Sequence, residues 1–310
     1  MSCYSYKKIG FIGAGCYGTA IAQSMSVRAE KIMLITDSQT INDDVNSRHV
    51  SSVLGNAKLS ENISCVINDY SAIKDCEVLF ITVPVGAVVT VCNLIKENAI
   101  KSPVILCSKG VDTENARLIS EVVEEIIDND LFVFSGPSFA IEVVQGLPFG
   151  VNLAGKDTKL ACKIAEKLSS EACTVKPITD YIGLQIAGAF KNILAIGCGM
   201  KRGLHLGNNA IAKFIVDGVA EMVQLATKMG GQKDTFSELG GIGDIILTCT
   251  SEQSRNERFG EHLAAGGTLS NWEGPLAEGA FAAKGIPVFA NKYDVQFNVF
   301  DEIYKAIYRK

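Results

Sequence analysis

The chain has 310 residues, 47% of them hydrophobic and 20% charged, which is typical of a globular protein and excludes a disordered one. The formal net charge of −5 gives no general attraction to nucleic acid or to an anionic membrane, so we expect neither as a partner. The length suggests two domains. The most apolar window, residues 78–91, is interrupted by polar residues and too short to span a membrane.

Cysteine and histidine usage indicates the compartment and argues against a metal site. The ten cysteines include no C-x-x-C pair, and two of them, Cys107 and Cys198, lie in apolar stretches. The start, MSCYSYKK, passes directly into an apolar run and lacks the pattern of a signal peptide. We expect a reduced, cytoplasmic protein. His49, His205 and His262 lie far apart, so no metal is predicted.

A glycine-rich turn follows the first predicted strand, residues 8–12. Gly13, Gly15 and Gly18 form a G-x-G-x-x-G motif, and a helical pattern comes after it. In a dinucleotide-binding turn these glycines give the tight turn, the approach to a pyrophosphate and close helix packing. The helix N-terminus then attracts phosphate. The motif therefore predicts a nicotinamide dinucleotide site.

The second predicted strand, residues 31–36, ends at Asp37. An acidic side chain there accepts hydrogen bonds from the ribose hydroxyls and repels a 2′-phosphate, which favours NAD, with NADP still possible. The plainer interpretation is an ordinary aspartate in a strand–loop turn. Arg48 is nearby in sequence, but we expect it to be too distant to favour NADP binding.

Strand-like and helix-like runs then alternate, which predicts a parallel sheet. We expect strands at 78–83, 104–107 and 131–134, with helices at 85–98 and 114–127. Helical periods replace this rhythm from about Tyr181. The predicted fold class is α/β, with a Rossmann-like doubly wound parallel sheet in residues 1–179 and an all-α domain in residues 180–310.

Small residues and one cation follow the predicted strands at the edge where such sheets bind ligands. These segments are Pro84, residues 108–110 with Lys109, and residues 135–140 (SGPSFA). Lys109 is either a ligand contact or a solvated loop lysine.

A 19-residue apolar segment, 182–200, contains a single charged side chain, Lys191. Such a helix is expected to be buried on most sides. Burial lowers the pKa of an ammonium group towards neutrality, where it can exchange protons. The alternative is that Lys191 extends to water along the helix. Leu184, Gly188 and Ala195 share its helical face, and the two small ones leave room for a ligand.

Two polar loops follow in the helical half. The loop GGIGD ends in Asp244, which is either a site residue or the N-cap of the next helix. Ser254, Arg255 and Asn256 offer a hydroxyl, a guanidinium and an amide in succession, which suits a phosphate. Otherwise Arg255 belongs to a charged helix end with Glu252 and Glu257 as partners. Residues 277–279 (AEG) follow a loop rich in glycine.

Several of these strings together resemble the bacterial-type NAD(P)-dependent glycerol-3-phosphate dehydrogenases, over nearly the whole chain and in order. They are GAGCYGTAIA at 13–22, SKG at 108–110, SGPSFAIEVVQGLP at 135–148, GAFKNILAIGCG at 188–199 and GIGDIILTCTSEQSRNERFG at 241–260. The resemblance implies reversible hydride transfer between NAD(P)H and dihydroxyacetone phosphate, supplying glycerol 3-phosphate for phospholipid synthesis, in a homodimer.

The resemblance also implies roles for individual residues. Lys191 matches the general acid/base, and Lys109 and Asp244 complete the catalytic group. Further substrate contacts are implied at Gly136, Ser138, Ser254, Arg255 and Asn256. Cofactor contacts are implied at Gly13, Gly15, Cys16, Tyr17, Gly18, Asp37, Lys109, Ala140, Arg255, Ala277 and Glu278.

Two departures from the family pattern affect the cofactor site. Cys16 and Tyr17 stand where the family most often has a small residue and a tryptophan or phenylalanine, and Tyr17 keeps an aromatic surface. Asp37 stands where many bacterial members have a basic or neutral residue, which puts an NADP preference in doubt. The alternatives are a related lysine-dependent β-hydroxyacid or 6-phosphogluconate-type dehydrogenase and a non-catalytic NADH sensor; the sensor is disfavoured because Lys109, Lys191 and Asp244 are all present.

Overall fold

The computed structural model describes residues 4–308, which form two compact units. Within the described residues, unit 1 comprises 4–108, Ser120–Phe134 and Ser138–Thr179, and unit 2 comprises Lys109–Ile119, Ser135–Pro137 and 180–308. Two short segments of the N-terminal half thus belong to the unit that contains the C-terminal helices. One of them begins with Lys109.

An eight-stranded sheet forms the centre of unit 1, with the strand order β12-β11-β10-β7-β6-β1-β2-β5. The pairs on both sides of β1 are parallel, with Ile9 opposite Ile32 on β2 and Val78 on β6. The strands are β1 (Tyr6–Ile12), β2 (Ala29–Thr36), β5 (Ile63–Ile67), β6 (Val78–Ile81), β7 (Val104–Leu106), β10 (Leu131–Ser135), β11 (Phe149–Gly155) and β12 (Cys173–Ile178).

This strand order is that of a doubly wound fold. The chain adds β2 and β5 on one side of β1 and then crosses to β6 on the other side. In open α/β sheets the ligand crevice lies beyond the carboxyl ends of the two strands where the direction of winding changes. In this sheet those strands are β1 and β6, and the glycine-rich turn directly follows β1.

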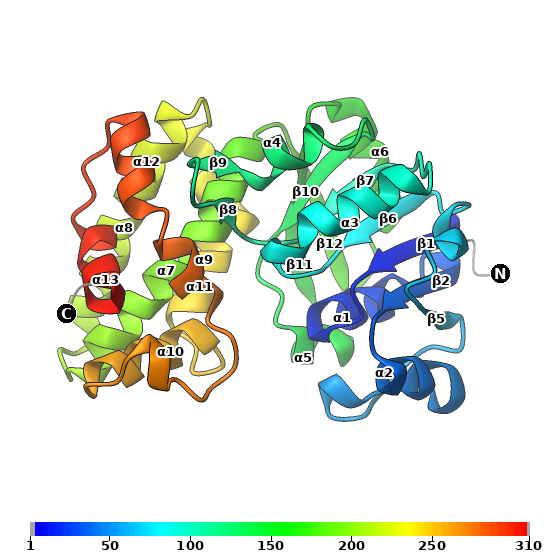
Figure 1. The fold of residues 1–310 in the computed structure, drawn as a ribbon, viewed down its shortest axis with the longest axis horizontal. Helices are drawn as coiled ribbons and strands as arrows, with labels where there is room; N and C mark the ends of the chain where they lie inside the picture. Colours follow the sequence, from blue (N-terminus) through cyan, green and yellow to red (C-terminus); the bar gives the residue numbers. More distant parts are fainter. Residues whose placement is uncertain (1–3, 309–310) are drawn as a thin grey trace. The chain divides into compact units, whose positions relative to one another are not determined.

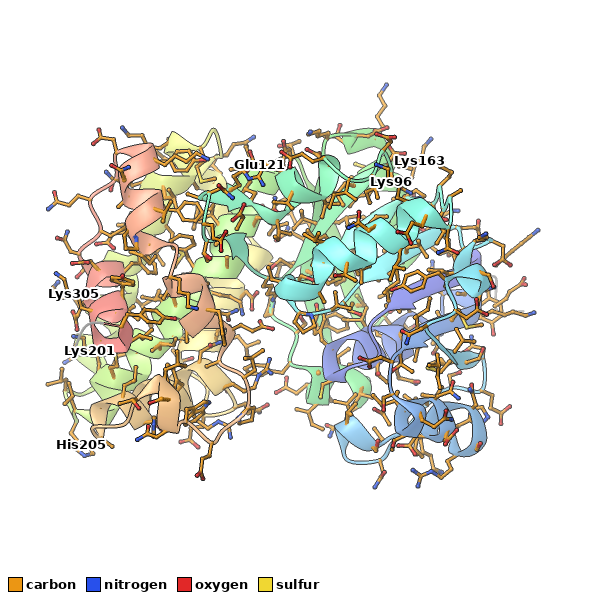
Figure 2. The ribbon with its side chains drawn as sticks, in the orientation of Figure 1. Lys96, Glu121, Lys163, Lys201, His205 and Lys305 are labelled. Carbon is orange, nitrogen blue, oxygen red and sulfur yellow. The ribbon has the colours of Figure 1, made fainter. Side chains whose placement is uncertain are left out.

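Apolar side chains cover the sheet and hold helices against it. Phe11 stacks on Phe80 with ring centroids 4.6 Å apart, and Phe134 meets Phe80 edge-on at 5.8 Å. The helices are α1 (Cys16–Met25), α2 (Gln39–Asp43), α3 (Val85–Glu97), α4 (Ile119–Glu124), α5 (Ala140–Val144) and α6 (Thr158–Leu168). The sides of these helices that face away from the sheet carry polar residues, such as Lys96 on α3 and Lys163 on α6, both exposed (Figure 2).

The predicted strands at 8–12, 31–36, 78–83, 104–107 and 131–134 are present, whereas β5, β11 and β12 were not predicted. The helix expected at 114–127 was wrong in its first part. Residues Val111–Asp112 and Arg117–Leu118 instead pair as strands β8 and β9. The Asp112 carboxylate accepts hydrogen bonds from the backbone N–H groups of Glu114 and Asn115, which stabilises a turn there. A second short hairpin, β3 (Val50–Ser51) with β4 (Ala57–Lys58), lies in unit 1.

Helix α7 is the central element of unit 2, and other helices pack around it (Figure 1). Phe190 anchors it, with ring centroids 5.6 Å from Phe289 and 5.1 Å from Phe300. No strand occurs within residues 180–308. The helices are α7 (Tyr181–Gly203), α8 (Asn208–Lys228), α9 (Asp244–Cys249), α10 (Arg255–Ala264), α11 (Glu278–Ala283), α12 (Ile286–Tyr293) and α13 (Val299–Tyr308).

Helix α7 is also the one described helix long and apolar enough to cross a membrane. Of its most apolar 18-residue window, 94% is buried inside the protein. Its apolar character therefore matches its place as the core helix of unit 2.

Glycines let α10 and α11 approach α7 closely. A Cβ at Gly199 would lie 1.9 Å from the Glu257 carbonyl oxygen, and one at Gly279 would lie 2.3 Å from the carbonyl oxygen of Asn192. No side chain larger than hydrogen fits at either crossing. The start of α11 is thereby held beside Asn192, the neighbour of Lys191.

Candidate active site

The glycine-rich turn has the geometry expected for a dinucleotide site. Gly13 has φ +106°, a conformation that favours glycine. A Cβ at Gly18 would lie 2.0 Å from the Gly13 carbonyl oxygen, so this position requires glycine for packing. A Cβ at Gly15 would meet nothing within 4 Å. Gly15 therefore borders open space at the start of α1, and the turn fits a pyrophosphate.

Thr82, at the end of β6, stabilises this turn, and sequence reasoning missed it. Its hydroxyl lies 2.7 Å from the Gly13 carbonyl oxygen and 3.1 Å from that of Ile12, and it donates to both. The contact joins the ends of the two strands that flank the expected crevice. The signal was available in the sequence as a threonine directly after the strand VLFI.

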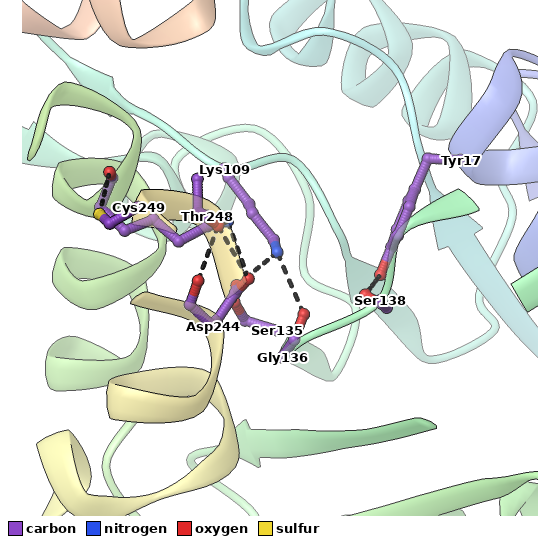
Figure 3. Close-up of polar contacts among 9 residues, drawn as sticks. Tyr17, Lys109, Ser135, Gly136, Ser138, Asp244, Thr248 and Cys249 are labelled. Atoms are coloured by element: carbon purple, nitrogen blue, oxygen red, sulfur yellow. Dashed lines mark hydrogen bonds and ion pairs between the residues drawn. The ribbon is translucent and has the colours of Figure 1, made fainter. Parts of the chain in front are cut away.

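Cys16 and Tyr17 lie next to the turn and contact two other segments of unit 1. The Cys16 thiol donates to the Val53 carbonyl oxygen at 3.1 Å, and the Tyr17 hydroxyl lies 3.2 Å from Ser138 Oγ (Figure 3). Ala140 is the first residue of α5, which packs against α1.

Asp37 is exposed and directly follows β2. Arg48, the nearby cation, forms an ion pair with the buried carboxylate of Asp44. Arg48 is thus already paired, and Asp37 is the charged residue at the carboxyl end of β2.

Lys191 lies in the interior of unit 2, with 6% of its surface exposed. Its ammonium group donates to Asp244 Oδ1 at 2.8 Å and to Thr248 Oγ1 at 2.6 Å. The alternative of a lysine extending to water is therefore wrong. Thr248 in turn donates to the Asp244 backbone carbonyl oxygen at 2.7 Å, so its hydroxyl is oriented to accept from Lys191.

Asp244 connects two lysines. Its Oδ2 lies 2.6 Å from Lys109 Nζ (Figure 3). Its Oδ1 accepts from Lys191. Asp244 is the first residue of α9, and Gly243 occupies the N-cap position, so the N-cap interpretation of Asp244 is wrong. Lys109 is mostly buried and paired, which rules out a solvated loop lysine. The cluster of Lys109, Lys191 and Asp244 carries a net charge of +1 when all three groups are ionised.

The surroundings of Lys191 in this cluster bring its pKa close to neutral pH. The pKa of Lys191 is lowered from 10.5 to about 8, chiefly by burial and also by Lys109, while Asp244 acts in the opposite direction and raises it. Burial alone would raise the pKa of Asp244, but the two ammonium groups outweigh it and keep the pKa below its ordinary value. Asp244 therefore stays ionised while Lys191 titrates within the physiological range.

The segment Ser135–Pro137 borders the cluster. Ser135 Oγ lies 3.5 Å from Asp244 Oδ2, and the Gly136 carbonyl oxygen accepts from Lys109 at 3.4 Å. Gly188, one turn before Lys191, leaves the space that these groups use: a Cβ there would lie 3.1 Å from Ser135 Oγ and 3.7 Å from the Lys109 side chain. Gly188 was predicted to leave room for a ligand, and in the structure the Lys109 side chain lies in that room.

In the Ser-Arg-Asn loop, the serine and the asparagine hold the starts of helices and the arginine is exposed. Ser254 is the N-cap of α10 and accepts from the Glu257 backbone N–H. The buried Asn256 accepts from the backbone N–H of Gly279 at 3.0 Å, which fixes the start of α11. Arg255 is the exposed first residue of α10. The same contact holds Ala277 and Glu278, the N-cap and first residue of α11, beside the loop.

Arg255 has no ion pair with the acidic residues proposed as its partners. Within residues 4–308, Glu257 pairs with Arg202 at 2.7 Å, and no contact joins Arg255 to Glu252. The interpretation of Arg255 as part of a self-paired helix terminus is therefore wrong. Its guanidinium remains available at the N-terminus of α10, where the helix dipole also favours an anion.

Thr248 and Asn192 lie beside Lys191, and sequence reasoning missed both. Thr248 lies one turn after Asp244, the i,i+4 spacing that places both on one face of α9. Asn192 is 94% buried directly after Lys191, and its side chain forms no hydrogen bond within the described residues. The signal available in the sequence was an amide inside an apolar segment, because buried polar groups ordinarily have partners.

A dinucleotide turn in unit 1 and a buried lysine–aspartate cluster in unit 2 define a nicotinamide-dependent oxidoreductase. The family model described as "NAD-dependent glycerol-3-phosphate dehydrogenase N-terminus" matches residues 8–161. The family model for the C-terminus of the same enzyme matches residues 180–310. The chain belongs to this family.

Curated relatives and a solved structure agree with that assignment. The glycerol-3-phosphate dehydrogenase [NAD(P)+] of Anaplasma phagocytophilum is 34% identical over 307 residues, 97% of this chain and 95% of that protein. The enzyme of the same name from Neorickettsia sennetsu is 36% identical over 94% of this chain and 87% of its own length. The crystal structure of glycerol-3-phosphate dehydrogenase from Coxiella burnetii superimposes with a TM-score of 0.91 at 30% identity, covering 98% and 95% of the two chains.

Proposed function

We propose that the protein reversibly reduces dihydroxyacetone phosphate to sn-glycerol 3-phosphate with NAD(P)H, and that Lys191 is the general acid/base. The observation that carries this proposal is the buried cluster of Lys191, Asp244 and Lys109. A nicotinamide cofactor bound at the glycine-rich turn supplies the hydride that adds to the ketone carbon.

Lys191 provides the proton. An ammonium group has three N–H donors, and the contacts to Asp244 and Thr248 use two of them. The third donates to the carbonyl oxygen and transfers its proton as negative charge develops there. In the reverse direction the neutral amine accepts the hydroxyl proton, which its pKa of about 8 permits near neutral pH.

Asp244 and Lys109 set the electrostatics of the transfer. Asp244 counteracts the desolvation of Lys191, so that a useful fraction of the lysine remains protonated. Lys109 adds a second positive charge within hydrogen-bond distance of the same carboxylate, which favours an anionic substrate and a developing oxyanion. Gly136 and Ser138 are proposed as further substrate contacts.

Arg255 is proposed to bind the substrate phosphate, together with Ser254 and Asn256. Its support is the exposed guanidinium at the first position of α10 without an acidic partner. Arginine binds two phosphate oxygens with its planar fork. Binding energy from this remote group orients the carbonyl relative to Lys191.

For the cofactor, we propose that NADH is used in preference to NADPH. Asp37 is exposed at the carboxyl end of β2, where its charge repels a 2′-phosphate. The remaining proposed contacts are Gly13, Gly15, Cys16, Tyr17, Gly18, Lys109, Ala140, Arg255, Ala277 and Glu278.

The cell location and assembly remain predictions. A cytoplasmic location is supported by buried free thiols at Cys65, Cys173, Cys198 and Cys249, as expected of a reducing compartment. A homodimer and a role in phospholipid synthesis are proposed from the family resemblance. Light scattering of the purified protein would decide the oligomeric state.

The test of the function is a steady-state assay of dihydroxyacetone phosphate reduction, run in parallel with NADH and NADPH. Turnover that is faster with NADH would support both the reaction and the role of Asp37. Turnover that favours NADPH would retain the reaction and overturn the cofactor preference. Cofactor binding without turnover would instead favour a different lysine-dependent hydroxyacid dehydrogenase or the NADH sensor.

A further inference from the structure

A buried carboxylate, Asp180, joins two segments of unit 2 that carry catalytic residues. Its Oδ1 accepts from the backbone N–H groups of Ile182 at 3.1 Å and Gly183 at 2.9 Å, which caps the start of α7. Its Oδ2 accepts from the Gln232 backbone N–H at 2.7 Å and from Thr235 Oγ1 at 2.6 Å. The carboxylate is 94% buried, so four hydrogen bonds compensate for its desolvation.

Glycine at position 183 leaves room for the Asp180 carboxylate. A Cβ at Gly183 would lie 2.2 Å from Asp180 Oδ2, so any larger residue would displace the carboxylate. Asp180 lies three helical turns before Lys191 on the same helix. One oxygen thus fixes the start of the lysine helix, and the other fixes a segment some 50 residues later in the chain.

That later segment leads directly to Asp244. Thr235 lies in a short turn, Lys233–Ser237, and the next turn, Leu239–Gly243, ends at the first residue of α9. Gly241 packs tightly on the first turn: a Cβ there would lie 2.4 Å from the Thr235 carbonyl oxygen. The two turns therefore behave as one packed unit, and their position determines where α9 begins.

We propose that Asp180 is a positioning residue: by tying the start of α7 to the turn at Thr235, it fixes the distance between the Asp244 carboxylate and the Lys191 ammonium group. It touches neither substrate nor cofactor. This inference rests on the proposed acid/base role of Lys191.

The charge environment of Lys191 sets the direction of the expected effect. Asp244 and Cys249 on α9 raise its pKa, whereas Lys109 and burial lower it. If α9 shifts away from α7, the attraction of Asp244 weakens while burial of Lys191 persists. The pKa of Lys191 then falls below its wild-type value.

The experiment measures the pKa of Lys191 directly, by NMR titration of protein labelled with 13C at the lysine ε-carbon. The Lys191 signal is assigned as the one missing in Lys191→Met. In Asp180→Asn, Oδ1 still caps α7, but the amide nitrogen cannot accept from Gln232. We expect the pKa to fall by about half a unit or more, and kcat to fall roughly 10-fold, with KM for the cofactor unchanged.

Glu221→Gln is the matched control. Glu221 is also a buried carboxylate of unit 2 that caps a helix, accepting from Asn298, Val299 and Phe300 at the start of α13. Glu221→Gln likewise replaces a buried capping carboxylate by an amide, but the hydrogen bonds of Glu221 hold the start of α13 and not the segment that leads to Asp244. We expect a lower melting temperature but an unchanged pKa of Lys191 and an unchanged kcat at 25 °C.

Thr235→Val tests the bridge without altering the cap on α7, so it remains informative if Asp180→Asn does not fold. We expect it to lower the pKa of Lys191, and Thr235→Ser, which keeps the hydroxyl, to restore it. The inference is overturned if Thr235→Val leaves the pKa and kcat at wild-type values, or if Glu221→Gln lowers the pKa as much as the Asp180 and Thr235 variants do. Full activity of Lys191→Met would refute the acid/base role, whereas the NMR titration would still decide the positioning role.

Discussion

Asp244 Oδ1 lies 2.8 Å from Lys191 Nζ, although 53 residues separate the two in the chain. Both side chains are almost fully buried, so neither ion is stabilised by water. Without this carboxylate, burial and Lys109 would lower the pKa of the Lys191 ammonium group further. The pair, with Lys109 on the second oxygen of Asp244, therefore maintains a proton donor in an apolar helix.

The two directions of the reaction should depend on pH in opposite ways. In the proposed mechanism, the free enzyme must hold Lys191 protonated to reduce the ketone and neutral to oxidise the alcohol. With a pKa of about 8, kcat/KM for dihydroxyacetone phosphate should fall as pH rises through 8, and kcat/KM for glycerol 3-phosphate should rise. Profiles from pH 6 to 10 in both directions measure this. Parallel profiles in the two directions would contradict the assignment.

Replacing Lys191 by methionine should lower kcat by at least ~10²-fold in both directions, because it removes the group proposed to donate and accept the proton. Methionine fills a similar volume in the helix interior. Cofactor affinity, measured by NADH fluorescence, should be unchanged because the glycine-rich turn belongs to unit 1. Lys228→Met, an exposed lysine on α8, is the control and should retain full activity. Retained turnover in Lys191→Met would remove this residue from the mechanism.

Arg255→Ala should raise KM for dihydroxyacetone phosphate strongly, since a charge-assisted bidentate contact is worth about 1.5–3 kcal/mol, or roughly 10- to 100-fold. Activity with unphosphorylated dihydroxyacetone, measured at saturating cofactor because Arg255 is also a proposed cofactor contact, should change little. Arg258→Ala removes another exposed arginine from the same helix and should leave both substrates unaffected. Equal losses with both substrates would show that Arg255 does not bind the phosphate.

Two alanine substitutions separate cofactor binding from folding at the glycine-rich turn. Gly15→Ala should leave the melting temperature unchanged, because its Cβ enters open space at φ −71°, yet raise KM for the cofactor by occupying the approach to the pyrophosphate. Gly18→Ala should destabilise the protein by about 1–3 kcal/mol, because its Cβ would overlap the Gly13 carbonyl oxygen. Thermal melts and cofactor titrations of both variants measure this. An unaltered cofactor KM in Gly15→Ala would place the pyrophosphate elsewhere.

Asp37→Asn should shift cofactor preference towards NADPH, because it removes the charge that repels the 2′-phosphate. We expect the ratio of kcat/KM for NADH to that for NADPH to fall about tenfold, the scale of one lost charged contact. Asp43→Asn, which removes the same charge from exposed helix α2, should leave the ratio unchanged. If both substitutions change the ratio equally, overall charge rather than Asp37 determines the preference.

Local patterns sufficed for much of the architecture. The glycine spacing after the first strand predicted the dinucleotide turn, because the tight turn and close packing each exclude side chains at particular positions. The switch from alternating strands to helical periods predicted the parallel sheet and the helices that follow Tyr181. The helix expected at 114–127 failed because side chain–backbone bonds of Asp112 stabilise a competing turn.

The sequence by itself determined which residues we propose for the chemistry: a lone lysine in an apolar helix, an aspartate after a glycine loop and an arginine between a serine and an asparagine. Only the tertiary structure decided how they are paired. It brought Lys109 and Asp244 to Lys191, assigned Glu257 to Arg202 rather than to Arg255, and used Ser254 and Asn256 to hold helix ends. These pairings join segments distant in sequence, and they depend on close helix packing. Local sequence periodicity does not predict which helices pack closely.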